Sequence, residues 1–286
     1  MSSFRVSKEE VKKFGDTPTL NNMNGIFYLY ATKEETLKEL LPPPLEFVAP
    51  VVIGYFVSFT NTTFGGPYME FMIGAPALYK GQIGVYPMSL MLCGHGAEMG
   101  KIAGTNCVGF PKKFADNMEF ERNGSTVKCK LSRHGVTLFE CKADIDGAYN
   151  TADAAGILAI NQPGDVVPGG YFVHHLNYIQ TEQGNMEFLN VDLMELFTEH
   201  TVKVFEPGKL VEIKVASSAD DAYGELEVVA PMAAAYFKTD GITMKSTKKL
   251  EPLDPEAVLP YLMTARFDRG LLGDPIEYQK DISSKN

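Results

Sequence analysis

Short runs of β-branched and aromatic residues recur along the chain and are separated by turn residues, a pattern that predicts many β-strands. Expected strands cover residues 26–30, 51–59, 82–92, 171–179, 187–195, 202–205, 210–216, 225–229 and 233–237. The dipeptide Pro207–Gly208 predicts a turn ahead of the strand at 210–216.

The most sharply defined local structure is expected at residues 118–145. Asn123–Gly124 is a strong hairpin signal, and residues 133–135 supply a second turn. Pairing Cys129 with Cys141 puts the apolar residues of both strands on one face, which fixes the register. The other pairs in this register are Leu131 with Phe139, Val127 with Ala143, Lys130 with Glu140 and Lys128 with Lys142. Lys130 and Glu140 attract each other, whereas the two facing lysines require solvent.

Helices are predicted to be few and short. Ser7 with Glu10, and Thr32 with Glu35, match the capping-box spacing, so helices are expected at 7–13 and 33–41. Further helices are expected at 153–160 and 255–264, the latter in a C-terminal extension that begins near residue 250. Many short strands with few helices favour a mainly β (α+β) fold with a closed or nearly closed antiparallel sheet. No internal repeat or low-complexity linker divides the chain, so residues 1–286 are expected to form a single domain.

Composition excludes several classes of partner. The net charge of the 286-residue chain is −10 and no basic block occurs, which argues against nucleic acid and anionic membranes as partners. No run of about 18 apolar residues and no apolar segment at the N-terminus is present, so we expect a cytoplasmic protein. The four cysteines lack metal-binding spacing, so free thiols and no bound metal are expected.

Two adjacent lysines, Lys112 and Lys113, follow Phe110 and Pro111 in an otherwise apolar stretch. Burial among apolar side chains lowers the pKa of a lysine from its usual value of about 10.4, and a neutral amine can form a Schiff base with a ketone or aldehyde. Two solvated lysines at the end of a strand are the simpler interpretation of such a pair. Because neighbours on a strand point to opposite faces, only one of the two can enter a pocket.

The segment around these lysines resembles the active-site segment of the acetoacetate decarboxylase family. Tyr68–Met69–Glu70, the stretch 79–86 and the proline-rich stretch 40–46 precede it in the family's order. The resemblance extends from about residue 26 to 120, and more faintly to about 245. It implies a barrel-like sheet that encloses an active-site cavity, a homo-oligomer, a small-molecule carbonyl substrate and no cofactor.

The resemblance also assigns roles to single residues. Lys112 matches the Schiff-base lysine, and Glu70 matches a pocket carboxylate suited to proton transfer. Met23 and Tyr55 stand where the decarboxylases carry an arginine and a second glutamate, so the charged groups expected to bind a substrate carboxylate are missing. The expected supporting residues of the pocket are Lys113, Tyr55, Met23, Phe110 and Cys107. A larger or less charged carbonyl compound than acetoacetate is therefore expected as the substrate.

Three functions are compatible with these residues. The first is a cofactor-independent carbon–carbon lyase that acts, like a decarboxylase, on a ketone or β-keto acid through a lysine Schiff base. The second is a Schiff-base aldolase or dehydratase, and the third is a non-catalytic protein that binds small molecules. His174 and His175 are expected on opposite faces of a strand, where they cannot share one metal ion.

Overall fold

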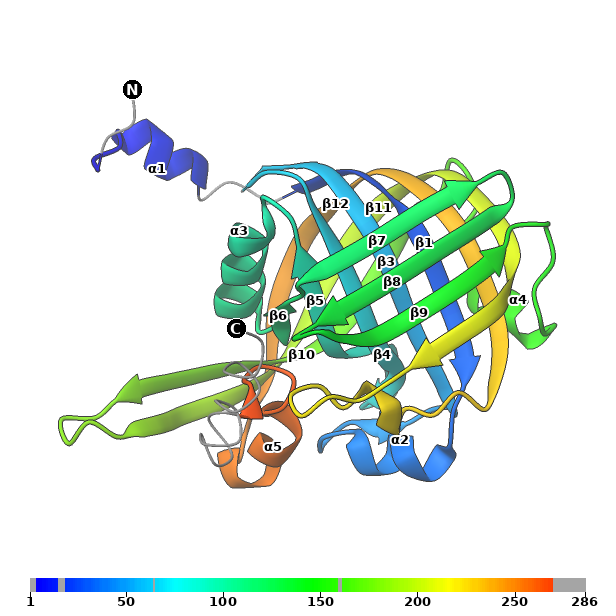
Figure 1. The fold of residues 1–286 in the computed structure, drawn as a ribbon. Helices are drawn as coiled ribbons and strands as arrows, with labels where there is room; N and C mark the ends of the chain where they lie inside the picture. Colours follow the sequence, from blue (N-terminus) through cyan, green and yellow to red (C-terminus); the bar gives the residue numbers. More distant parts are fainter. Residues whose placement is uncertain (1–3, 15–18, 64, 159–160, 270–286) are drawn as a thin grey trace, which may run out of the picture.

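The computed structural model describes residues 4–14, 19–63, 65–158 and 161–269. The strands of this part form one sheet, and the helices around it are short (Figure 1). The strands are β1 (Thr19–Ala31), β2 (Glu46–Phe47), β3 (Val51–Thr62), β4 (Tyr68–Tyr79), β5 (Gln82–Cys93), β6 (Lys112–Phe114), β7 (Asn117–Asn123), β8 (Thr126–Arg133), β9 (Val136–Asp144), β10 (Val166–Gln180), β11 (Met186–Val215) and β12 (Ala230–Leu253). The helices are α1 (Lys8–Phe14), α2 (Glu34–Leu40), α3 (Ala97–Ile102), the π-helix η1 (Ala103–Val108), α4 (Asp153–Leu158), the 3-10 helix η2 (Tyr223–Glu225) and α5 (Pro255–Leu262). The prediction of a mainly β fold with a few short helices is confirmed.

The sheet closes on itself. Its strand order is β10-β5-β4-β3-β1-β12-β11, and β11 pairs again with β10, so these strands form a ring. Most neighbours are antiparallel, as predicted, while β5 pairs in parallel with both β10 and β6. Beyond the ring, the end of β11 pairs with β9, and β8 and β7 follow in order.

The layer made by β7, β8 and β9 packs across the outside of the ring (Figure 1). Phe139 of this layer lies against both Tyr28 and Phe71 of the ring, with ring centroids 4.8 Å apart in each case. Successive residues of a ring strand face opposite sides, so Phe56 joins this outer core while Val57 joins the inner one. Every ring strand contributes to the inner core, which includes Leu20, Met23, Val57, Phe59, Tyr68, Met72, Leu90, Leu92, Val173, Leu196 and Phe237.

The hairpin register at 118–145 is confirmed. Cys129 pairs with Cys141, and the other predicted partners also face each other. Lys130 and Glu140 form an ion pair of 3.6 Å. The register shifts by one residue after Leu131, ahead of the turn. The capping box of the first helix is also present, because Ser7 and Glu10 exchange hydrogen bonds with each other's backbone N–H groups.

The turn predicted at Pro207–Gly208 is wrong, because β11 runs through these residues as one strand. Gly208 still pairs with Ala234 of β12, and Lys209 already pairs with Asp144 of β9. A Cβ on Gly208 would lie 2.6 Å from the carbonyl oxygen of Asp144. The dipeptide therefore marks the place where β11 changes partner, and glycine permits the close approach of β9.

Two further predictions need correction. The segment 225–229 is not a strand, since η2 ends at Glu225 and β12 begins at Ala230. The capping box at Thr32 does not form: the N-cap of α2 is Lys33, and the buried Thr32 hydroxyl has no hydrogen-bond partner among the described residues. The last strand, β12, ends at Leu253, near the expected start of the C-terminal extension. The helix predicted at 153–160 is α4, with 159–160 outside the described residues.

Within the described chain, no helix is long and apolar enough to cross a membrane.

Candidate active site

Strand β6 directs its two lysines to opposite sides. Lys112 pairs with Leu90 of β5 and shares its inward face, whereas Lys113 pairs with Met91, which belongs to the outer core. Both lysines are buried. The expectation that only one lysine faces the interior of the sheet agrees with this arrangement.

Lys112 lies in a short chain of hydrogen bonds. Its Nζ donates to Oε2 of Glu70 over 2.7 Å, and the Tyr55 hydroxyl donates to Oε1 of the same carboxylate, also over 2.7 Å. The side chains of Lys112 and Glu70 are only 7% and 5% exposed. Burial, with the nearby Glu70 charge, holds the pKa of Tyr55 well above its usual value, so its phenol stays protonated and remains a donor. The three residues come from β6, β4 and β3.

Apolar and aromatic side chains surround these three hydrogen-bonded residues. The Phe110 ring centroid lies 5.5 Å from the Lys112 Nζ, and Phe110 packs edge-on against Tyr171. Met23 belongs to the same inner core as Phe110 and supplies no charge. Burial, together with the Glu70 charge, raises the pKa of Tyr171 to about 12. The site therefore combines one amine and one carboxylate with protonated phenols in a largely apolar setting.

Gly104 of η1 lies against the Lys112 side chain. A Cβ at this position would lie 2.5 Å from Cε of Lys112 and 2.9 Å from its Nζ. No larger residue fits unless the lysine moves. Sequence reasoning missed this steric role of Gly104. The short spacing between Gly104 and the lysines was the available signal.

Lys113 has very different neighbours. It donates to the carbonyl oxygen of Asp220 over 2.8 Å, and its Nζ lies 3.1 Å from Asp221 and 3.2 Å from Asp268. Arg133 joins the group with contacts of 3.0 Å to Asp221 and 2.7 Å to Asp268. Sequence reasoning missed these partners, since no motif connects them to the lysine pair.

Cys107 and the two neighbouring histidines, His174 and His175, differ in their exposure. Cys107 lies exposed on η1, and the residue of η1 that lies against Lys112 is Gly104, so a supporting role for Cys107 stays a prediction. His174 and His175 do face opposite sides, as predicted. His174 is fully buried, while Nε2 of His175 lies 2.9 Å from the Asn106 carbonyl oxygen. Burial is the main cause that lowers the pKa of His174 to about 3, and the positive charge of Arg266 adds to it, so the ring is neutral.

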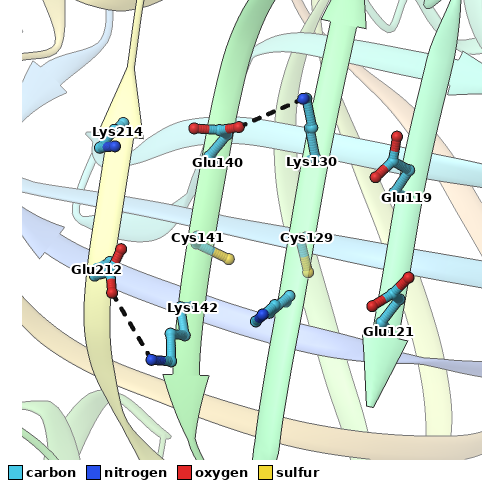
Figure 2. Close-up of a pocket in the computed structure, with 10 residues that line it drawn as sticks. Glu119, Glu121, Cys129, Lys130, Glu140, Cys141, Lys142, Glu212 and Lys214 are labelled. Carbon is cyan, nitrogen blue, oxygen red and sulfur yellow. Dashed lines mark ion pairs between the residues drawn. The ribbon is translucent and has the colours of Figure 1, made fainter. Parts of the chain in front are cut away.

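Two hollows in the described surface lie away from Lys112 and Glu70. One, of about 360 Å³, lies on the charged face of β7, β8, β9 and β11 (Figure 2). Figure 2 shows its glutamates and lysines side by side, with ion pairs of Lys130 with Glu140 and of Lys142 with Glu212. The other, of about 440 Å³, lies beside α5 and is lined in part by Tyr86, Ser89 and Tyr223.

One cluster has side chains of metal-ligand type. His134, Asp220 and Asp268 each place one ligand atom within 4.8 Å of the others. Asp268 already contacts Arg133 and Lys113. A divalent cation at this place would compete with two positive charges, so the ion pairs explain the cluster without a metal.

Comparisons with known proteins cover nearly the whole chain. The profile of the family described as acetoacetate decarboxylase matches residues 5–251, beyond the range expected from the motifs. The CLA biosynthesis isomerase of Lactiplantibacillus plantarum is 38% identical over 273 residues, which cover 94% of this chain and 96% of that protein. An acetoacetate decarboxylase of Burkholderia mallei is 35% identical over 94 residues, covering 33% of this chain and 37% of that protein. The crystal structure of acetoacetate decarboxylase from Legionella pneumophila has a TM-score of 0.70 at 20% identity, over 88% of this chain and 99% of that chain, and shows the same fold.

Proposed function

The chain belongs to the acetoacetate decarboxylase family, whose members are lysine Schiff-base enzymes, and from this premise we propose that it moves a carbon–carbon double bond in an unsaturated ketone. The reaction would run through an imine at Lys112. The observation that carries the proposal is the buried chain of hydrogen bonds from Lys112 to Glu70 and from Tyr55 to Glu70. This arrangement combines a nucleophilic amine, Lys112, with one group that can carry a proton, Glu70, and Tyr55 adds no further charge.

Imine formation is the first step. Transfer of one proton from the Lys112 ammonium to Glu70 frees the amine, which adds to the ketone carbonyl carbon. Glu70 returns this proton to the carbonyl oxygen and then moves a second proton from the nitrogen to the same oxygen, which leaves as water. The product is a protonated imine, which attracts electrons from the carbon next to it.

Isomerisation then needs only one proton carrier. In a β,γ-unsaturated ketone, the carbon between the imine and the double bond loses a proton to the Glu70 carboxylate, which gives a dienamine. The same proton returns at the γ-carbon, so the double bond becomes conjugated with the imine. Water then releases the conjugated ketone and restores Lys112. Tyr55 donates to Oε1 throughout and keeps Oε2 directed at the reacting carbons.

Isomerisation suits this site better than decarboxylation for two reasons. A β-keto acid brings a carboxylate into a buried space that already holds Glu70, and Met23 replaces the expected arginine. An unsaturated ketone with an alkyl chain brings no charge and fits the apolar walls. The relative named as an isomerase, which aligns with 94% of this chain, supports the same choice.

The test uses the purified protein and a β,γ-unsaturated methyl ketone with an alkyl tail. We expect the ultraviolet absorbance of the conjugated enone to appear, and borohydride added during turnover to attach the ketone covalently to the peptide that contains Lys112. The Lys112→Met variant is the matched control and should show neither signal. Release of carbon dioxide from a β-keto acid without enone formation would identify a decarboxylase instead. Absence of covalent trapping would identify a binding protein.

A further inference from the structure

The strand that carries Lys112 has little support from the sheet. β6 has three residues and pairs with β5 at three positions. It follows η1, whose C-cap, Gly109, has a left-handed φ of 99°. So short a segment needs other contacts to hold the lysine in one direction.

Arg266 supplies one set of contacts. Its guanidinium donates to the carbonyl oxygens of Gly109 over 2.8 Å, of His174 over 2.9 Å and of Leu262 over 3.2 Å. Loss of hydration by burial lowers the pKa of Arg266 to about 10, although it stays charged at neutral pH. The contact to Gly109 is three residues before Lys112 and ties η1 to β10.

Asp268 supplies the second set, on the other flank of Lys112. Its carboxylate lies 3.2 Å from the Lys113 Nζ and accepts two hydrogen bonds from Arg133, over 2.7 and 2.8 Å. The backbone N–H of Arg269 donates to Asp220 over 2.8 Å, and the carbonyl of Asp220 accepts from Lys113. Four consecutive residues, 266–269, therefore reach both sides of the strand.

We propose that residues 266–269, the C-terminal clamp, hold β6 in place and thereby aim the Lys112 amine at Glu70. Arg266 and Asp268 are positioning residues, because they act through Gly109 and Lys113 and do not touch Lys112 in the described contacts. The clamp lies beyond residues 5–251, which the family profile matches. Its catalytic consequence rests on the proposed function, whereas its effect on the segment 104–114 does not.

A small movement of β6 has a large chemical effect. The amine must meet a carbonyl carbon and exchange protons with Glu70 in one geometry, and a misplacement of about 1 Å can reduce a rate by about 100-fold. Anchors before and after Lys112 restrict both translation and rotation of the strand. The inner core is built by the ring strands, so loss of the clamp should change the rate more than substrate binding.

The test compares Arg266→Ala and Asp268→Asn with Arg269→Ala as the matched control. Arg269 contacts Asp220 through its backbone N–H, so this substitution leaves the contact in place. Two quantities are measured: hydrogen–deuterium exchange of the peptide 104–114, and the rate at which acetylacetone forms an ultraviolet-absorbing enaminone with Lys112. We expect faster exchange and a rate about 100-fold lower for Arg266→Ala, a loss of about tenfold for Asp268→Asn, and no change for Arg269→Ala.

Further measurements separate positioning from general loss of structure. Methylguanidinium should restore part of the rate of Arg266→Ala, and the KM for an unsaturated ketone should change less than kcat. If Arg266→Ala does not fold, the exchange and the enaminone rate of Arg266→Lys and Asp268→Asn test the clamp instead. Each of these substitutions keeps the size and most of the polarity of the side chain. Unchanged exchange and rate in folded variants would overturn the clamp. Faster exchange in the variants, with no enaminone even in the unaltered protein, would uphold the clamp and refute the proposed function.

Discussion

Lys112 and Lys113 are neighbours of the same type and similar burial, yet their surroundings differ in kind. Lys112 faces the inner core with one carboxylate, Glu70, which also accepts from Tyr55. Lys113 faces outward into a group of two carboxylates, a backbone carbonyl and Arg133. Burial is therefore common to both lysines and cannot by itself distinguish a reactive amine from a structural one.

The difference lies in what remains after a proton moves. When Lys112 gives its proton to Glu70, both groups become neutral and stay hydrogen-bonded, so no buried charge is left alone. When Lys113 loses its proton, Asp221 and Asp268 share only Arg133 as a close cation in this group. The first environment thus pairs one amine with one carboxylate, whereas the second holds two carboxylates around Lys113 and Arg133. We therefore predict that Lys112 carries out the chemistry and that Lys113 anchors β6.

Replacement of Lys112 should have the largest effect. Lys112→Ala and Lys112→Arg are both expected to abolish borohydride trapping and enone formation, since alanine has no amine and a guanidinium stays charged and is not a nucleophile at neutral pH. Mass measurement of the peptide after borohydride treatment checks this. Residual trapping on Lys113 in either variant would show that the two lysines can exchange roles.

Replacement of Glu70, the proposed proton carrier, comes next. Glu70→Gln keeps the shape and can still accept hydrogen bonds from Lys112 and Tyr55, but it cannot accept a proton. We expect kcat to fall by about 10²–10⁴-fold, the usual contribution of general acid–base catalysis. Steady-state kinetics with the unsaturated ketone measure this fall. The control is Asp268→Asn, which replaces a carboxylate of the outer group, and its kcat should fall far less. Equal losses would remove the distinction between the two environments.

The sequence reveals the inner site better than the outer one for a physical reason. Pro111–Lys112–Lys113 and Glu70 lie in short motifs, and the alternation of side chains along a strand predicts that the lysines diverge. The partners of Lys113 come from far along the chain: Asp221 is 108 positions away, and Arg133 lies 135 positions from Asp268. Such contacts depend on the closure of the ring and the course of the chain after α5. Neither is encoded in a local pattern.

The fold shows the same limit. The register of β8 and β9 follows from local alternation and a tight turn, and it was predictable residue by residue. The 30-residue strand β11 was expected as separate pieces with a turn at Pro207–Gly208. Its continuity comes from pairing with β12 before Lys209 and with β9 after it. Long-range pairing overrides turn propensity there, because the partners already satisfy the backbone.

A charge added to the inner side should sharpen the contrast between the two environments. Met23→Arg introduces a cation where the resemblance expects one, and an ion-assisted hydrogen bond to a substrate carboxylate is typically worth about 1.5–3 kcal/mol. We expect acetoacetate decarboxylation to rise by about 10–100-fold, with a loss of activity on unsaturated ketones with alkyl tails. Carbon dioxide release measures the first and enone absorbance the second. Efficient acetoacetate decarboxylation by the unaltered protein would contradict the inference from the missing arginine.

Replacement of Lys113 should have the smallest effect on chemistry and a clear effect on stability. Lys113→Met leaves Arg133 as the one lysine or arginine paired with Asp221 and Asp268 among the described residues, and removing one partner of a buried ion pair typically costs about 3–5 kcal/mol. Urea unfolding should show this loss.

Trapping by Lys113→Met should persist within about tenfold of the unaltered rate, because Arg266 still holds Gly109 while the outer anchor of β6 is weakened. Adding Asp268→Asn to this variant should recover part of the stability, because it removes one of the two carboxylates that then share Arg133. It should recover none of the trapping rate. Loss of trapping as complete as in Lys112→Ala would mean that Lys113 acts on the amine directly, through its charge, and the division between the two faces of β6 would then be wrong.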